Sequence, residues 1–294
     1  MFNFLRKRRA GPSKTTEWSP GGHLKKRPGV ESPPAALLIL NQPIYDIAGF
    51  RSLWHDCTYR ICADGGANRL HDFVKEVLED LPHEEVTRDR FLPDKIRGDL
   101  DSLRPEVELY YRDRGVHITK DPDQDSTDFT KCLKDVDAEM TKRSAGGDFD
   151  VIVLGGLAGR VDQAFSTIHH LYATTAAPVS NVSSGNMSHV AGASKIYLYS
   201  DESISFVLQK GKNVIRTPMG HGVLAENIGI LPIGGPAVIS TNGLEWDVEN
   251  WMTEFGGQIS TSNHIRSDVV EVETSERVLF TLERSGRQKK KNSP

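Results

Sequence analysis

Cysteine is scarce in this 294-residue chain, and its three cysteines, Cys57, Cys62 and Cys132, form no C-x-x-C pair. Disulfide frameworks and structural zinc sites both need more thiols at closer spacing, so the sequence indicates neither. We therefore expect a reducing, cytoplasmic environment. No apolar run approaches the roughly 20 residues that a membrane-spanning helix needs, so we expect no membrane partner.

The sequence also lacks the signatures of two large classes of nucleotide enzyme. It contains no G-x-x-x-x-G-K-S/T segment, which excludes a P-loop enzyme, because that segment cradles the phosphates with its backbone amides. Neither an H-R-D nor a D-F-G segment of the protein-kinase type occurs. Any nucleotide chemistry in this protein therefore needs a site of another kind.

Basic residues are rare in the central part of the chain and concentrate at its two ends. Of the 36 Lys and Arg residues, eight lie in residues 1–29 and five in residues 284–294, whereas only one of the 40 acidic residues lies in these ends. Residues 30–283 therefore carry a formal net charge of −16. This charge argues against a nucleic-acid partner, because such binding rests on cationic contacts to phosphate.

Two basic tails are predicted, one at residues 1–34 and one at residues 284–294. The first is rich in Pro, Gly, Ser and Lys and lacks the apolar segment of a secretory signal, so we expect it to be disordered and solvated. A nuclear or RNA-contacting role of this tail is the alternative.

Between the tails, the sequence predicts an α/β domain followed by an all-β domain. Short apolar runs such as residues 59–62 and 151–154 predict buried strands, and turns and helical periodicity follow them. Strand–turn–helix units of this kind predict a Rossmann-like, mainly parallel sheet over residues 35–178. A Ser/Gly-rich linker or insertion is expected at residues 179–194, and short strands separated by turns predict a β-sandwich over residues 195–283.

Three acidic clusters, each at a predicted turn, form the densest group of reactive side chains in the chain. They are A-D-G-G-A-N at 63–68, R-G-D-L-D-S at 97–102 and D-P-D-Q-D-S-T-D at 121–128. Carboxylates this close repel one another unless a cation binds among them, and Mg²⁺ prefers oxygen ligands of this type. Ligands of parallel sheets bind beyond the carboxyl ends of the strands, so we expect the clusters to converge on one rim.

Each cluster also has a plainer explanation. Asp99 and Asp101 point the same way if they lie in a strand and can then reach one ion, but Asp is also common in polar turns. Asp125 and Asp128 lie at the start of a predicted helix, where an acid stabilises the helix dipole by roughly 0.3–1 kcal/mol. The run of acids at 121, 123, 125 and 128 exceeds any capping need, which favours the metal site.

A glycine-rich turn adds a feature suited to phosphate. Gly155-Gly156 ends a predicted strand and precedes a helix, so its backbone N–H groups can face a phosphate. Arg160 supplies a side chain that can donate two hydrogen bonds to the same group. Together with the acidic clusters, this turn predicts an enzyme that handles a nucleotide phosphate chain.

The order of the motifs is far more specific than any one of them. Along the chain they are ADGGANRL (63–70), GDLDS (98–102), DQDSTDFTKCL (123–133), GGLAGRVDQ (155–163), TNGLEW (241–246) and STSN (260–263). This series closely resembles the thiamine pyrophosphokinase family in its eukaryotic form, over about residues 36–283.

The resemblance implies a reaction, a fold and an assembly. The reaction is transfer of the pyrophosphoryl group of ATP to the hydroxyl of thiamine, with Mg²⁺ as cofactor and thiamine diphosphate and AMP as products. The fold is an α/β catalytic domain followed by a β-sandwich, in a homodimer whose active site lies at the subunit interface. Two other classes remain open: another Mg²⁺-dependent nucleotide pyrophosphotransferase or hydrolase on this scaffold, and a non-catalytic thiamine or nucleotide sensor.

Carried onto this sequence, the family's motifs imply three groups of site residues. The catalytic carboxylates are Asp99, Asp101, Asp125 and Asp128, of which Asp99, Asp101 and Asp128 bind Mg²⁺ and Asp125 or Asp128 is the candidate base. The ATP-binding residues are Asp64, Gly65, Gly66, Gln124, Lys131, Gly155, Gly156, Arg160, Asp162 and Gln163. The thiamine-binding residues are Trp246, Ser260 and Asn263.

Some of these residues have a second interpretation. Lys131 follows Asp128 by three positions and can pair with it on the helix instead of reaching ATP. Trp246 taken alone is more often core packing, but its place in the TNGLEW motif favours a contact with the cationic thiazolium ring. Asp121 and Asp123 are expected to be bystanders in their loop.

Overall fold

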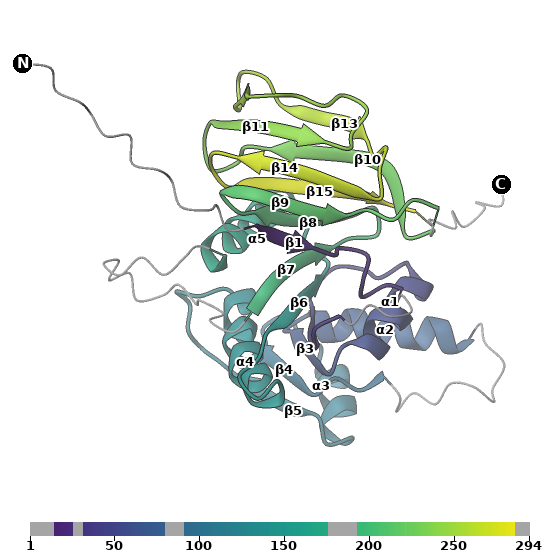
Figure 1. The fold of residues 1–294 in the computed structure, drawn as a ribbon. Coiled ribbons are helices and arrows are strands. Elements are labelled where there is room, and N and C mark those ends of the chain that lie inside the picture. The colour runs from purple at the N-terminus through teal and green to yellow at the C-terminus, as the bar shows by residue number, and fades with distance from the viewer. Residues whose placement is uncertain (1–14, 26–31, 80–90, 176–192, 221, 286–294) are drawn as a thin grey trace, which may run out of the picture.

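An α/β half and a β-rich half make up the architecture of this protein (Figure 1). The structure, a computed structural model, describes residues 15–25, 32–79, 91–175, 193–220 and 222–285. No helix in these ranges is long and apolar enough to cross a membrane.

The α/β half alternates strands and helices along the chain. Its elements are β2 (Ala35–Ile39), α1 (Ile47–Asp56), β3 (Tyr59–Ala63), α2 (Gly66–Glu79), β4 (Lys95–Gly98), α3 (Pro105–Arg112), β5 (His117–Lys120), α4 (Asp128–Arg143), β6 (Phe149–Leu154), α5 (Val161–Thr174) and β7 (Ala193–Tyr199). Successive residues of β2 pack into two different apolar clusters. Leu37 shares one with Phe50 and Leu53 of α1, whereas Leu38 shares the other with Leu133 of α4. Helices therefore cover both faces of the sheet, which is why β2 is buried at every position.

The β-rich half is built from short strands. Its elements are β1 (Thr16–Trp18), β8 (Ser203–Leu208), β9 (Gly211–Arg216), β10 (Leu224–Leu231), β11 (Ala237–Asn242), β12 (Trp251–Thr253), β13 (Ser260–His264), β14 (Val269–Thr274) and β15 (Val278–Arg284). Five of them form one sheet in the order β1-β9-β14-β11-β12. The others belong to a second sheet that continues into the α/β half.

That second sheet is mixed, and its ten described strands follow the order β13-β10-β15-β8-β7-β6-β2-β3-β4-β5. Pairing is parallel from β7 to β5 and antiparallel from β7 to β13. We assigned residues 195–283 to a β-sandwich domain; β7, at the start of that range, pairs in parallel with β6 of the α/β half, with Ile196 opposite Val151. Because β7 joins both halves, one sheet runs through the whole protein.

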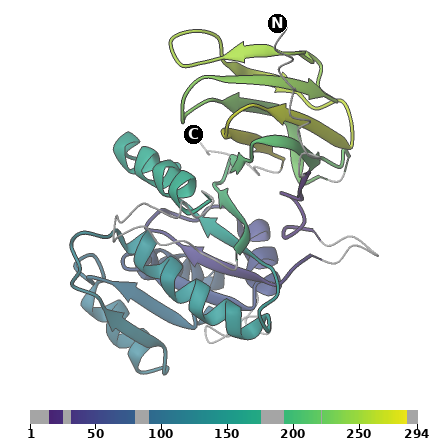
Figure 2. The same cartoon turned by 60° about the vertical axis from the view of Figure 1, so that its left-hand side comes forward.

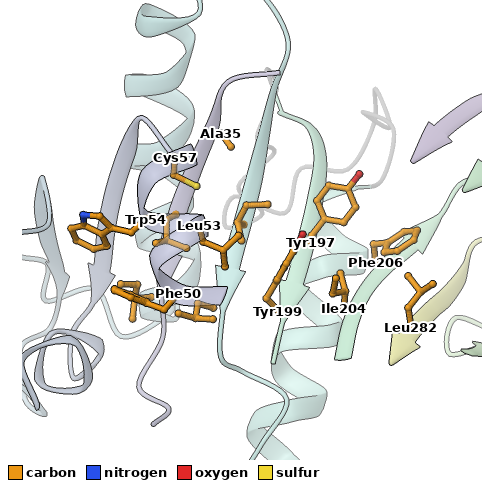
Figure 3. Packing of buried hydrophobic residues seen from close by; sticks show 14 of the residues in the cluster. Ala35, Phe50, Leu53, Trp54, Cys57, Tyr197, Tyr199, Ile204, Phe206 and Leu282 are labelled. Atoms are coloured by element: carbon orange, nitrogen blue, oxygen red, sulfur yellow. The ribbon is translucent and has the colours of Figure 1, made fainter. Parts of the chain in front are cut away.

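The core is continuous across this junction. Figure 3 shows Phe50, Leu53 and Trp54 of α1 on one side and Phe206 of β8 and Leu282 of β15 on the other, with Tyr197 and Tyr199 of β7 between them. Aromatic contacts extend along this row, since the ring centroids of Tyr197 and Phe206 lie 5.4 Å apart. The two halves are therefore fixed relative to each other by buried apolar packing.

The N-terminal segment departs from its prediction. We expected residues 1–34 to be disordered, but residues 16–18 form β1, which pairs in parallel with β9. Trp18 is buried, its Nε1 donates to Asn213 Oδ1 at 3.0 Å, and its ring stacks on Phe206 at 4.7 Å. The prediction fails here because a three-residue strand inside a polar segment has no periodicity and depends on partners far along the chain. Residues 1–14, most of the predicted linker at 179–194 and nearly all of the C-terminal tail lie outside the described residues.

Candidate active site

The carboxyl ends of neighbouring strands bring three aspartates together. Asp64 follows β3, Asp99 follows β4, and Asp128 is the first residue of α4, which packs against both strands. One carboxylate oxygen from each of the three lies within 4.8 Å of the others. This group, Asp64, Asp99 and Asp128, is called the acid cluster below.

Local backbone geometry explains why the sequence folds this way. Asp64 has φ 43° and Leu100 has φ 63°, so each turns the chain sharply in the left-handed region after its strand. Gly98 lies between the acids: a Cβ at this position would lie 2.7 Å from Asp64 Cβ and 3.1 Å from Asp128 Cγ. Gly98 is therefore required for the carboxylates to approach one another. This role was not predicted from the sequence, although the place of Gly98 directly before Asp99 was the available signal.

Asp64 is the member of the acid cluster whose negative charge is least compensated by its surroundings. Its side chain is buried, Oδ2 accepts from Ser102 N at 3.1 Å, and Oδ1 has no hydrogen-bond partner among the described residues. Burial raises the pKa of Asp64 to about 6, and the nearby charges of Asp128, Asp101 and Asp99 add to this effect. A buried carboxylate oxygen without a partner is destabilising unless something positive binds it.

Asp128 is the member of the acid cluster that contacts a lysine. Burial raises its pKa, while the hydrogen bond from Lys131 opposes that rise. Lys131 is itself buried, and its Nζ lies 3.2 Å from Asp128 Oδ1 and 3.1 Å from the carbonyl oxygen of Asp121. The structure thus places Lys131 in the helix pairing that was one of its two interpretations.

Three convergent carboxylates with one buried, unpartnered oxygen fit a hard divalent cation such as Mg²⁺, which takes oxygen ligands. One predicted ligand lies outside the group. Asp101 is exposed, its backbone N–H donates to Asp99 Oδ1 at 3.2 Å, and its Oδ1 accepts from Ser102 Oγ at 2.9 Å. Our argument that Asp99 and Asp101 share one side of a strand does not apply, because β4 ends at Gly98 and Leu100 has a left-handed conformation.

The loop before α4 holds the remaining predicted acids. Asp125 and Gln124 are exposed, and the backbone N–H of Asp125 donates to Asp123 Oδ1 at 2.9 Å. Thr127, directly before Asp128, caps α4 by accepting from Thr130 N through its side chain. Asp125 therefore lies on the rim beside the acid cluster without joining it.

The glycine-rich turn lies on the other side of β2. Gly155 and Gly156 have φ near 92° and 93°, and a Cβ on Gly156 would lie 2.9 Å from both Leu40 Cδ1 and Thr167 Cγ2. Because β2 lies between β6 and β3 in the sheet, the segment after β2 separates this turn from the acid cluster. A Cβ on Gly155 would lie 3.0 Å from Gln42 in that segment, and a Cβ on Gly65 would lie 2.4 Å from Asn41. Close backbone approach therefore explains the glycines of both motifs.

Arg160 immediately precedes α5 and occupies its N-cap position. Its guanidinium pairs with the Asp162 carboxylate at 2.5 Å, and both side chains are largely exposed. Gln163 follows in the first turn of α5 and is also exposed. These polar groups therefore stand in solvent at a helix N-terminus, where a phosphate can reach them.

The predicted thiamine residues come together in a groove of the β-rich half. Trp246, Ser260 and Asn263 line it together with Trp251 and other side chains. The side chain of Asn263 holds the backbone of Trp246 through two hydrogen bonds. Its Oδ1 accepts from Trp246 N at 3.1 Å, and its Nδ2 donates to Trp246 O at 2.9 Å. Trp246 is 55% exposed, which excludes the core-packing interpretation of this residue.

Two further aromatic residues at or beside the groove were not predicted from the sequence. Trp251 lines the groove, and His264 lies beside it, with its ring centroid 5.0 Å from that of Trp246. Neither belongs to a motif that we used; the aromatic character of Trp251 was the only available signal. The groove lies by β11 and β13, at the end of the molecule opposite β4 and β5, as both views of the fold make plain (Figures 1 and 2).

Comparison with known proteins bears on both halves. The family model described as "Thiamin pyrophosphokinase, catalytic domain" matches residues 50–181, and "Thiamin pyrophosphokinase, vitamin B1 binding domain" matches residues 212–279. The chain belongs to the thiamine pyrophosphokinase family. Thiamine pyrophosphokinase 3 of Oryza sativa subsp. japonica is 35% identical over 254 residues, covering 84% of this chain and 86% of the relative. The thiamine pyrophosphokinase of Saccharomyces cerevisiae is 30% identical over 292 residues, covering 85% of each chain.

Solved structures of the thiamine pyrophosphokinase family agree with the fold. The thiamin pyrophosphokinase from Candida albicans matches with a TM-score of 0.74 and 26% identity, over 94% of this chain and 95% of that one. The yeast thiamin pyrophosphokinase matches with the same TM-score and 28% identity, over 92% and 91%. The predicted family membership is thus confirmed, and the two-part architecture is that of the family.

Proposed function

We propose that this protein transfers the pyrophosphoryl group of ATP to the hydroxyl of thiamine, giving thiamine diphosphate and AMP. The observation that carries the proposal is the pairing of an acid cluster with a glycine-rich turn across the end of β2, in a chain of this family. Such transfer depends on positioning and charge neutralisation more than on covalent chemistry by the protein.

The acid cluster is our candidate for the Mg²⁺ site, with Asp64, Asp99 and Asp128 as ligands. Bound there, Mg²⁺ would neutralise the phosphate oxygens of ATP. Asp101 would act by holding Asp99 through its backbone N–H, and its direct ligation stays a prediction. Asp125, exposed on the same rim, is our candidate to orient the thiamine hydroxyl or accept its proton.

The ATP phosphates would bind between this cluster and the start of α5. There Gly156 lies in the turn, and Arg160 can exchange its Asp162 partner for a phosphate. The backbone N–H of Gly155 donates to Tyr199 O at 2.8 Å, so it is not free to bind a phosphate as the sequence suggested. Gln163, Gln124 and the turn at Gly65-Gly66 would line the remaining nucleotide surface. Lys131, buried against Asp128, would support the metal ligand without touching ATP.

Thiamine would bind in the groove against Trp246, because an aromatic face attracts a cationic ring. Since groove and acid cluster lie at opposite ends of one chain, we propose a homodimer in which each site combines the acid cluster of one subunit with the groove of the other. Exposed apolar side chains support this arrangement. Val161 and Phe165 lie in the first turns of α5, which follows the glycine-rich turn, and Met252 and Phe255 lie in and just after β12, the strand of the groove residue Trp251. A cytoplasmic location stays a prediction, and the three cysteines are buried free thiols.

The reaction is tested by incubating the protein with ATP, Mg²⁺ and thiamine and separating the products by chromatography. We expect AMP and thiamine diphosphate in equal amounts. ADP as the only nucleotide product would contradict pyrophosphoryl transfer and favour a hydrolase on this scaffold. Thiamine binding without turnover would favour a sensor.

The shared site is tested by complementation between two inactive variants. Asp99→Asn lacks the acid cluster, and Trp246→Ala lacks the groove. In a heterodimer of the two, one site receives the intact acid cluster and the intact groove, so co-expression should restore about a quarter of wild-type activity. Heterodimers isolated through two affinity tags that remain inactive would refute a site built from two subunits.

A further inference from the structure

The loop at residues 121–127, between β5 and α4, is fixed firmly where it begins. The backbone N–H of Asp121 donates to Gly98 O at 2.7 Å, and its carboxylate Oδ2 accepts from Arg97 Nη2 at 2.7 Å. The carbonyl oxygen of Asp121 accepts from Lys131 Nζ at 3.1 Å. One residue, which the sequence suggested was a bystander, thus makes contacts with a strand, an arginine and a buried lysine.

Lys131 carries this connection into the acid cluster. Its side chain is only 2% exposed, and the same Nζ that binds the Asp121 carbonyl lies 3.2 Å from Asp128 Oδ1. A lysine buried this completely is uncommon and requires partners for its charge. The position of the Asp128 carboxylate therefore depends on where Lys131 Nζ lies, and Nζ depends on Asp121.

We propose that Asp121 is a positioning residue for the metal site: Arg97 holds Asp121, and Lys131 relays that position to the Asp128 carboxylate. The same anchor sets the start of the loop that presents Gln124 and Asp125. The proposal rests on the proposed function insofar as it takes the acid cluster to be a metal site. Partners that orient a metal ligand typically change metal affinity by roughly 10–100-fold when removed.

Arg97 also provides a matched control. Its Nη1 binds Asp135 Oδ1 at 2.7 Å, the same length as its bond to Asp121. Asp135 lies on α4 beyond Lys131, and its other partner is Lys95. Loss of Asp135 therefore weakens the attachment of Arg97 to α4 without touching the Asp121 carbonyl, Lys131 or Asp128.

The experiment compares Asp121→Ala, Asp121→Asn and Asp135→Ala in the full chain without substrates. Mn²⁺ binding is measured by electron paramagnetic resonance, and hydrogen exchange is followed by mass spectrometry for peptides that span residues 121–128. For Asp121→Ala we expect the Mn²⁺ Kd to rise by about 10–100-fold and exchange in the loop to quicken. Asp121→Asn should change less, because its amide oxygen can still accept from Arg97, and Asp135→Ala should leave the Mn²⁺ Kd within about twofold.

Equal effects of Asp121→Ala and Asp135→Ala on Mn²⁺ binding and loop exchange would overturn the proposal, since Asp121 would then serve only general stability. If Asp121→Ala does not fold, the comparison of Asp121→Asn with Asp135→Ala decides in the same way. If the acid cluster is not a metal site, the result is different. The wild type would then bind no Mn²⁺, or its Mn²⁺ binding would be unchanged by Asp99→Asn. The exchange data alone would then support or refute the anchor.

Discussion

Asp64→Asn is a substitution for which we predict opposite effects on stability and on function. The Asp64 carboxylate is buried, one of its oxygens has no described partner, and its pKa is raised to about 6. At neutral pH and without a cation, ionised Asp64 therefore destabilises the folded state. We expect Asp64→Asn to stabilise the protein in the presence of a chelator and to abolish metal binding.

The magnitude follows from the pKa. An aspartate ordinarily ionises near pH 4, so a folded-state pKa of about 6 corresponds to roughly 3 kcal/mol of destabilisation at higher pH. Solvent near the neighbouring carboxylates screens part of it, and we expect the variant to gain about 1–2 kcal/mol. For a chain of this size the gain corresponds to a rise in Tm of about 2–3 °C. The asparagine fits because its carbonyl can accept from Ser102 N and its amide can donate to the other carboxylates.

The effect has a defined pH dependence. Below about pH 4 the wild-type carboxyl is protonated in the folded and the unfolded states, so the two proteins should be equally stable. As pH rises to about 6, the unfolded chain ionises first and the wild type loses stability relative to the variant. Above about pH 6 the difference should stay constant.

Urea unfolding followed by circular dichroism, at pH 4, 5, 6 and 8 with EDTA, measures this difference. Added Mg²⁺ should then stabilise the wild type and leave Asp64→Asn unchanged, because only the wild type binds the ion. Asp125→Asn, which removes one exposed acid from the same rim, is the control and should show no gain. A variant that is no more stable than the wild type at pH 8 in EDTA would refute the view that the acid cluster holds uncompensated charge.

Two further predictions concern Gly98 and His23. Gly98→Ala should reduce activity by about 100-fold with little change in circular dichroism, because the new Cβ would displace the Asp64 and Asp128 side chains; near-normal turnover would mean that the site tolerates their displacement. The two ring nitrogens of His23 lie 2.6 and 3.0 Å from two buried carboxylates. Burial lowers the pKa of His23, but the hydrogen bonds to these carboxylates outweigh burial and raise the pKa to about 9. Its stabilisation should therefore be complete below about pH 6.5 and be lost as pH rises through 9. His23→Gln should cost about 3–5 kcal/mol in urea unfolding at pH 6 and lack that pH-dependent loss; an unchanged midpoint at pH 6 would show that the bridge does not stabilise the fold.

Parts of this site could be predicted from sequence because their determinants are local. A turn that follows a buried strand must supply its own polar groups and glycines, so the acids after β3 and β4 and the glycines after β6 mark the rim directly. The choice between Asp64 and Asp101 could not be made in this way. It depends on the left-handed conformation of Leu100 and on which carboxylates meet across neighbouring strands.

The connection between the two halves depends on long-range pairing and was therefore missed. β7 carries the same alternation whether it starts a sandwich or completes a parallel sheet, and only its pairing with β6 decides. The short strand β1 depends likewise on β9, nearly 200 residues away. Such contacts leave little trace in the composition of either segment.

The contrast between buried carboxylates strengthens the assignment of the acid cluster. Two other buried or half-buried acids have basic partners: the Asp150 carboxylate pairs with His23, and the Asp135 carboxylate pairs with both Lys95 and Arg97. In the acid cluster, by contrast, three carboxylates come together and only Asp128 pairs with a lysine, Lys131. Leaving that charge uncompensated destabilises the protein, so a bound cation is the simplest physical reason for its presence.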